Sequence, residues 1–204
     1  LNAVLCFLAV VYGLPLTIFR GLMTLLRTIY AIVFFIFTTL CMMTPLVHIY
    51  LLFGKITEKK KYNLHRILNF MAKFVLRYHK IPGVRYTESN NSGEDFTKPA
   101  VIICNHQSHL DLAPMLALTP KIIVLTADWV WKNPVYRFTI RNAEFLPASS
   151  GMDAIMPQLK SLVERGYSIA VYPEGTRSMD CSIGRFRQGA FHVAQTLGID
   201  ILPV

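Results

Sequence analysis

AVIICNHQSHLD, residues 100–111, decides the fold of this chain. Its first five residues, 100–104, form an uninterrupted apolar run, which is the pattern of a short strand buried on both faces. A polar turn follows, and residues 110–118 have the apolar spacing of a helix that ends before Pro120. A strand, a polar loop and a helix in this order are typical of α/β domains, in which ligands bind beyond the carboxyl ends of parallel strands.

The same alternation continues to the end of the chain. Short apolar runs predict further strands at 122–125, 144–146, 168–172 and 199–202, and the segments between them predict a stretch that is helical in part at 128–140 and helices at 153–165 and 188–197. We therefore predict an α/β fold with a largely parallel sheet over residues 86–204. A helical apolar stripe over 62–78 predicts a helix before the sheet, either packed on the core or lying on a membrane surface.

The N-terminal quarter of the chain is almost free of charge. Residues 1–54 carry two charged side chains, Arg20 and Arg27. The uncharged stretches on either side, 1–19 and 28–54, are long enough to cross a hydrocarbon core of about 30 Å. We predict that 1–54 is a membrane segment of one or two hydrophobic helices. A hairpin that enters only one leaflet is equally compatible with these residues.

Basic residues gather directly after this segment. Residues 55–85 hold nine of them against one acid, Glu58; the nine are Lys55, Lys59, Lys60, Lys61, Arg66, Lys73, Arg77, Lys80 and Arg85. A basic cluster beside an apolar span indicates anionic membrane lipid on the cytoplasmic side. We therefore expect 55–85 to lie on a cell membrane, with the following domain on the cytoplasmic face. Nucleic acid is the competing explanation, but no nucleic-acid-binding motif follows the cluster.

The polar residues after the first strand can carry chemistry. Four residues separate His106 from Asp111, so the carboxylate can reach one ring nitrogen across the turn and leave the other as a base. A structural histidine satisfied by its neighbour has the same pattern. The chain has no nucleophilic elbow, since GYSIA at 166–170 lacks the final glycine. A dyad without its own nucleophile suits a reaction in which the substrate supplies the hydroxyl.

A second polar segment, YPEGTRS at 172–178, follows the strand predicted at 168–172. Its glycine permits close backbone approach, and the hydroxyls of Thr176 and Ser178 can donate hydrogen bonds. Arg177 offers a planar fork for a phosphate or carboxylate. A tight turn with a solvated arginine is the alternative interpretation.

Together the two segments resemble the glycerolipid acyltransferase family, and specifically its lysophosphatidate acyltransferases. Residues 105–111 resemble the first block of that family, with His109 where an aromatic residue is usual, and 172–178 resemble the third block. GRFRQGA at 184–190 is similar to the basic segment that follows, and 201–204 to the start of the fourth block.

The resemblance implies a function and its residues. His106 would be the general base and Asp111 its orienting carboxylate, while the hydroxyl of a lysolipid attacks an acyl thioester on coenzyme A or acyl carrier protein. The acceptor expected is 1-acylglycerol 3-phosphate, which gives phosphatidate, and no metal or prosthetic group is needed. The residues expected to hold the acceptor's polar head are Glu174, Gly175, Thr176, Arg177 and Arg187.

One block departs from the family pattern. NAEFLPA at 142–148 ends in Ala148, where an arginine that helps to bind the acceptor phosphate is common. Arg137, Arg141 or Arg187 could replace the missing charge. Alternatively, the acceptor is another membrane lipid, such as an amino-acid lipid or a glycolipid.

Three further expectations complete the sequence-based interpretation. Cys104, His106 and His109 could be read as metal ligands, although their spacing lacks the paired ligands of structural zinc sites. An inactive membrane-anchored scaffold is the alternative of another functional class. The chain starts at Leu1 and stops inside an apolar run at Val204, so we expect a piece of a longer protein with the domain at 86–204 truncated.

Overall fold

The computed structural model describes residues 16–38, 44–78, 87–108, 111–177 and 182–204. Five parallel strands form one sheet in the order β3-β2-β4-β1-β5. Their bounds are β1 (Ala100–Ile103), β2 (Ile122–Thr126), β3 (Leu146–Pro147), β4 (Ser168–Val171) and β5 (Asp200–Pro203). The predicted α/β fold with a parallel sheet is confirmed.

The central strands are apolar throughout because the sheet is buried on both faces. Val101 and Ile102 in β1, Ile123 in β2 and Ile169 in β4 are fully buried. β1 and β4 are neighbours, with the last residue of each strand in register. The two polar segments singled out in the sequence therefore begin side by side at the carboxyl edge of the sheet.

Helices follow the strands as expected. They are α5 (Leu112–Leu118), α6 (Asp128–Lys132), α7 (Pro134–Asn142), α8 (Met152–Glu164) and α9 (Gly189–Leu197). α8 packs against β4, and α9 packs against β1 and β5. The stretch 128–140, which was expected to be helical in part, forms two helices. Asn133 separates them because its side chain accepts a hydrogen bond from the N–H of Val135 and caps α7, with Pro134 in the first turn.

α4 (Glu58–Tyr78) is a helix of the core along one face. Leu64 and Leu68 are buried, and Asn69 Nδ2 donates hydrogen bonds to two carbonyls at the end of α5, 2.7 Å from Leu116 O and 3.0 Å from Ala117 O. The core-packing alternative for this helix is confirmed by its buried face, and the membrane-surface alternative stays a prediction.

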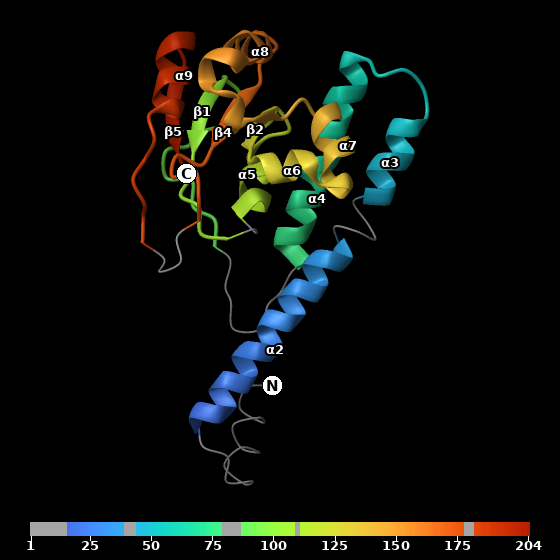
Figure 1. Ribbon diagram of the computed structural model, residues 1–204, viewed down its shortest axis with the longest axis vertical. Coiled ribbons are helices and arrows are strands. Elements are labelled where there is room, and N and C mark those ends of the chain that lie inside the picture. The colour runs from blue at the N-terminus through green and yellow to red at the C-terminus, as the bar shows by residue number, and fades with distance from the viewer. Residues whose placement is uncertain (1–15, 39–43, 79–86, 109–110, 178–181) are drawn as a thin grey trace.

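The N-terminal helices differ from the expected spans. α2 (Leu16–Ile36) is one continuous helix that contains both Arg20 and Arg27 and projects away from the sheet (Figure 1). α3 (Thr44–Leu52) lies against α7. The uncharged stretches 1–19 and 28–54 therefore do not coincide with the helices of the described residues. Within the described ranges, none of the helices is both long and apolar enough to cross a membrane. Residues 1–15 lie outside those ranges.

Lys60 does not belong to a basic surface. Its side chain is buried, and Nζ donates hydrogen bonds to the carbonyls of Leu51, Phe53 and Gly54 at 3.1, 2.6 and 3.1 Å. These carbonyls lie at the C-terminus of α3, where a cation complements the helix dipole. The prediction that this lysine faces anionic lipid is thus wrong, because its ammonium group binds the free carbonyl groups at the end of α3. Lys80 and Arg85 of the same cluster lie outside the described residues.

Candidate active site

His106 and Asp111 are in contact on the loop after β1. His106 Nδ1 lies 3.1 Å from Asp111 Oδ2, and about a quarter of each side chain is exposed. The same carboxylate oxygen accepts hydrogen bonds from the backbone N–H groups of Gln107 and Ser108, both at 2.7 Å. These three contacts on one oxygen hold the carboxylate in place. The contact expected from the spacing is present, and it leaves the second ring nitrogen for a substrate proton.

Glu174 joins this loop to the segment before α9. Its carboxylate is buried, with Oε1 accepting from the backbone N–H of His106 at 2.8 Å and Oε2 from that of Gly184 at 2.9 Å. Gln107 adds a second link between the same loops, because its Nε2 donates to Ser182 O at 3.2 Å. Each carboxylate oxygen of Glu174 accepts one backbone hydrogen bond, so this side chain has a structural role in joining the two loops. Its expected contact with the acceptor's polar head stays a prediction.

Gly175 makes room for an arginine. Its φ of 70° lies in the left-handed region, and a Cβ added here would lie 3.0 Å from Arg187 Nε. The backbone N–H of Arg187 donates to Pro173 O at 2.8 Å, which fixes the two segments against each other. Gly175 therefore contributes space and backbone shape, and its expected role becomes that of a support for Arg187.

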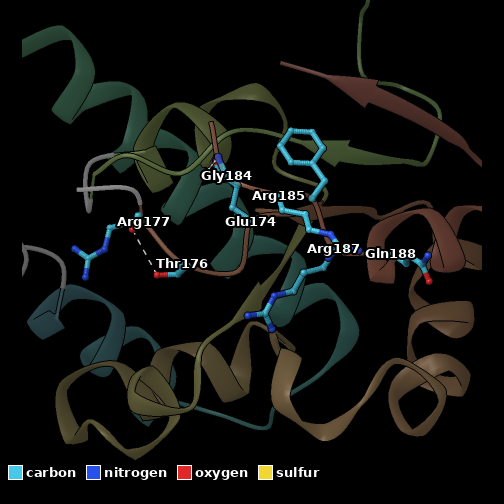
Figure 2. Close-up of a pocket in the computed structure, with 8 residues that line it drawn as sticks. Glu174, Thr176, Arg177, Gly184, Arg185, Arg187 and Gln188 are labelled. Atoms are coloured by element: carbon cyan, nitrogen blue, oxygen red, sulfur yellow. Dashed lines mark hydrogen bonds between the residues drawn. The ribbon is translucent and has the colours of Figure 1, made fainter. Parts of the chain in front are cut away.

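These segments enclose a cavity of about 520 Å³ (Figure 2). Its lining residues are Glu174, Thr176, Arg177, Gly184, Arg185, Phe186, Arg187 and Gln188. The lining holds three arginines and one carboxylate, and that carboxylate already accepts hydrogen bonds from backbone donors. Figure 2 shows Arg177 on one side of the cavity and Arg185 and Arg187 on the other. The cavity is therefore suited to an anionic ligand of moderate size.

Arg185 was not among the predicted site residues, although it belongs to the basic segment at 184–190. The alternation of arginine with other residues in GRFRQGA carries the signal, because both Arg185 and Arg187 line the cavity. Of the three arginines considered as substitutes for the charge missing at Ala148, Arg187 is the one found in the cavity lining. Arg141 instead lies over the Trp131 ring, 5.4 Å from its centroid.

The thiol beside the dyad is not set up as a nucleophile. Burial raises the pKa of Cys104, and the negative charges of Asp111 and Glu174 raise it further. The thiol therefore stays protonated at neutral pH. No group of three or more His, Cys, Asp or Glu side chains within the described ranges could hold a metal ion. His109, the third ligand of the metal alternative, lies outside those ranges.

Comparisons with known proteins agree on one family. The acyltransferase family model matches residues 83–204. A chloroplastic 1-acyl-sn-glycerol-3-phosphate acyltransferase of Arabidopsis thaliana is 31% identical over 111 residues, which are 52% of this chain and 31% of that protein. The human 1-acyl-sn-glycerol-3-phosphate acyltransferase beta is 25% identical over 143 residues, 67% of this chain and 51% of that protein. This chain thus spans about a third to a half of these relatives.

A solved structure shares the fold. The 1-acyl-sn-glycerophosphate acyltransferase PlsC of Thermotoga maritima superposes with a TM-score of 0.66 over 90% of this chain and 74% of that one, at 21% sequence identity. The structural match shows the fold, and the sequence match over more than half of the chain shows the family. The chain belongs to the acyltransferase family.

Proposed function

We propose that this protein transfers a fatty acyl group from an acyl thioester, carried by coenzyme A or acyl carrier protein, to the free hydroxyl of 1-acylglycerol 3-phosphate. The product is phosphatidate, a precursor in phospholipid biosynthesis. The observation that carries the proposal is the single carboxylate of Glu174, which holds the loop of His106 and the loop of the arginine cavity together. A base and an anion site then act on the same acceptor molecule.

The chemistry follows from the dyad. The second ring nitrogen of His106 removes the proton of the acceptor hydroxyl as its oxygen attacks the thioester carbonyl, and Asp111 stabilises the imidazolium that forms. The tetrahedral intermediate collapses with loss of the thiolate, which takes the proton from the imidazolium. The ester and a free thiol are the products. Each step uses groups of the chain and of the two substrates, without a metal or a prosthetic group.

The acceptor's phosphate is assigned to the arginine cavity. Arg177 and Arg187 offer planar forks that bind phosphate oxygens in pairs, and Arg185 adds a third positive charge. Thr176 is exposed beside them with a hydroxyl that can donate a hydrogen bond. This charge compensates for Ala148 and favours a phosphate ester over a neutral lipid. A non-phosphatidate acceptor, such as an amino-acid lipid or a glycolipid, is the second candidate, because Ala148 itself brings no charge to the end of β3.

A membrane location belongs to the same proposal. Large apolar side chains on α2 are about half exposed, namely Ile18, Leu22, Leu25, Leu26, Ile29, Ile32 and Val33. A helix that presents these groups and projects from the domain (Figure 1) is suited to a lipid surface, where acceptor and product reside. We place the protein at the cell membrane, with the domain on the cytoplasmic face and anionic lipid near the basic residues that remain exposed.

The decisive experiment is an acyl-transfer assay with a panel of acceptors and with acyl-CoA and acyl carrier protein as donors. Mass spectrometry identifies the product. We expect lysophosphatidate to be the preferred acceptor and His106→Ala to be inactive. Preference for an uncharged lysolipid would select the second candidate, and no transfer to any acceptor would select the scaffold. Deleting residues 16–36 should weaken flotation with anionic vesicles and make it sensitive to salt, because exposed basic residues of 55–85 remain. Unchanged flotation would contradict the anchoring part.

A further inference from the structure

The aromatic ring of Tyr172 stacks on the ring of His106. The two ring centroids are 4.2 Å apart, and the ring planes differ by 24°. Tyr172 directly follows β4 and His106 lies just beyond β1, and these neighbouring strands end in register. The stack is therefore a consequence of the sheet order, which brings together two segments that are far apart in the sequence.

The stacked ring of Tyr172 adds a further constraint on the orientation of the His106 ring. The backbone of His106 is held by Glu174, and its Nδ1 is held by Asp111 at 3.1 Å. One hydrogen bond to one ring atom still lets the ring plane tilt about that contact. A second ring lying nearly parallel at 4.2 Å opposes this tilt, so it determines where the other nitrogen points.

We propose that Tyr172 is a positioning residue, whose ring fixes the plane of the His106 imidazole so that its second nitrogen meets the acceptor hydroxyl. This inference rests on the proposed role of His106 as the base. A positional error of about 1 Å in such a group costs on the order of a hundredfold in rate. The ring therefore affects the chemical step without contact to either substrate.

The ring of Tyr172 acts here rather than its hydroxyl. The hydroxyl oxygen is buried and has no hydrogen-bond partner within the part of the chain that the structure describes. Burial also raises the pKa of Tyr172 far above its ordinary value, so the hydroxyl stays neutral and does not exchange protons with the dyad. A phenylalanine at this position keeps the stack, whereas a leucine of similar hydrophobicity removes it.

The chain provides a matched control at the other end of β4. Tyr167 directly precedes that strand, is 4% exposed, and also contacts a histidine, His65, at 5.0 Å between ring centroids and 55° between planes. Replacing Tyr167 with leucine removes a comparable buried aromatic contact on the same strand. It does so at the opposite edge of the sheet, away from the dyad.

The test compares Tyr172→Leu, Tyr172→Phe and Tyr167→Leu in the full chain, with rates expressed per folded molecule. We expect Tyr172→Leu to lower kcat about tenfold to a hundredfold with the KM values of donor and acceptor unchanged. Tyr172→Phe should restore kcat, and Tyr167→Leu should reduce thermal stability alone. Equal loss of kcat in the two leucine variants, or no rescue by phenylalanine, would overturn the positioning role.

A second readout does not depend on activity. In the protein with isotope-labelled histidine, the His106 ring signal is identified by its absence in His106→Ala. The signal should lose its ring-current shift in Tyr172→Leu and keep it in Tyr172→Phe. An unchanged signal in Tyr172→Leu would refute the stack itself. An inactive unmodified protein with the expected signals would refute the proposed function and leave the stack intact.

Discussion

A carboxylate oxygen of Glu174 accepts a hydrogen bond from the backbone N–H of His106 at 2.8 Å, and its second oxygen accepts one from Gly184 at 2.9 Å. The buried carboxylate is thereby satisfied by main-chain donors alone. Any movement of the cavity segment is transmitted to the histidine, because both depend on the same side chain. We therefore expect Glu174 to affect activity through the position of the His106 loop.

Glu174→Gln tests this relationship. The glutamine amide NH₂ would face a backbone N–H where a carboxylate oxygen now accepts, so one buried donor loses its partner at a cost of about 1–3 kcal/mol. We expect lower kcat and a lower melting temperature. Exposed Glu164, changed to glutamine, is the control and should have neither effect. An effect confined to the acceptor KM, with full stability, would restore the direct binding role.

The dyad predicts a large and specific loss of activity. His106→Ala should reduce kcat by about 10²–10⁴-fold, the usual contribution of a positioned base. Asp111→Asn should also lose most of the activity, because it removes the charge that stabilises the imidazolium. The control is His192→Ala, since His192 Nε2 also lies 3.1 Å from a carboxylate, Asp153, on the exposed side of α8 and α9. Steady-state kinetics should show full activity there. Retained activity in His106→Ala would reject the dyad.

Arg187→Lys should weaken acceptor binding. Lysine keeps the charge but lacks the fork, and the lost charge-assisted hydrogen bonds of about 1.5–3 kcal/mol correspond to roughly a tenfold to hundredfold higher KM for lysophosphatidate. The KM for the acyl thioester should stay the same. Exposed Arg137, changed to lysine, serves as the control. If the thioester KM rises instead, the cavity binds the donor.

His65 predicts how stability depends on pH. Burial lowers its pKa to about 4, while the charges of Glu144 and Arg165 act in opposite directions. The unfolded chain, with an ordinary histidine pKa near 6.5, binds the proton more strongly, so stability is full above about pH 6.5 and falls toward pH 4 by about 3 kcal/mol. Urea unfolding at several pH values measures this. His65→Leu should flatten the profile, and an unaltered profile would place the dependence on other groups.

Lys60→Met should destabilise the N-terminal helical region. The change removes the ammonium from three carbonyls at the end of α3. Buried acceptors left without a partner cost about 1–3 kcal/mol, which should appear in a lower melting temperature. Exposed Lys59, changed to methionine, provides the control. Lys60→Met should leave binding to anionic vesicles unchanged. Weaker vesicle binding with full stability would show that this lysine contacts the membrane surface.

Much of the fold was predictable because the sheet is parallel and central. Apolar runs located the strands of the described sheet within one or two residues. Strands that are covered on both faces have apolar side chains in succession, and this pattern is visible in the sequence. The stretch 128–140 was predicted to be helical in part, and the cap at Asn133 with Pro134 decides where one helix ends and the next begins. The bounds of α2 were not predictable from uncharged length, because the helix includes both Arg20 and Arg27.

In the candidate site, too, contacts between residues near in sequence were predictable and contacts between distant residues were not. The contact of His106 with Asp111 was predictable because it spans one turn of the chain. The partners of Glu174 were not, because its hydrogen bond to His106 joins positions 68 residues apart. Arg185 was missed although the alternation of arginines in GRFRQGA marks it, because only the folded loop shows that both arginines line the cavity.

The sequence by itself determined which segments become strands, which polar residues follow them, and which family the chain resembles. These properties depend on local patterns of apolar and polar residues and on the order of motifs. Only the tertiary structure decided what each side chain does. Because β1 and β4 are neighbours in the sheet, the Tyr172 ring stacks on the His106 ring and Glu174 accepts a hydrogen bond from the backbone of His106. The physical reason is that a buried charge or ring interacts with the groups that the fold places beside it. These groups can be far away in the sequence, so local patterns do not identify them.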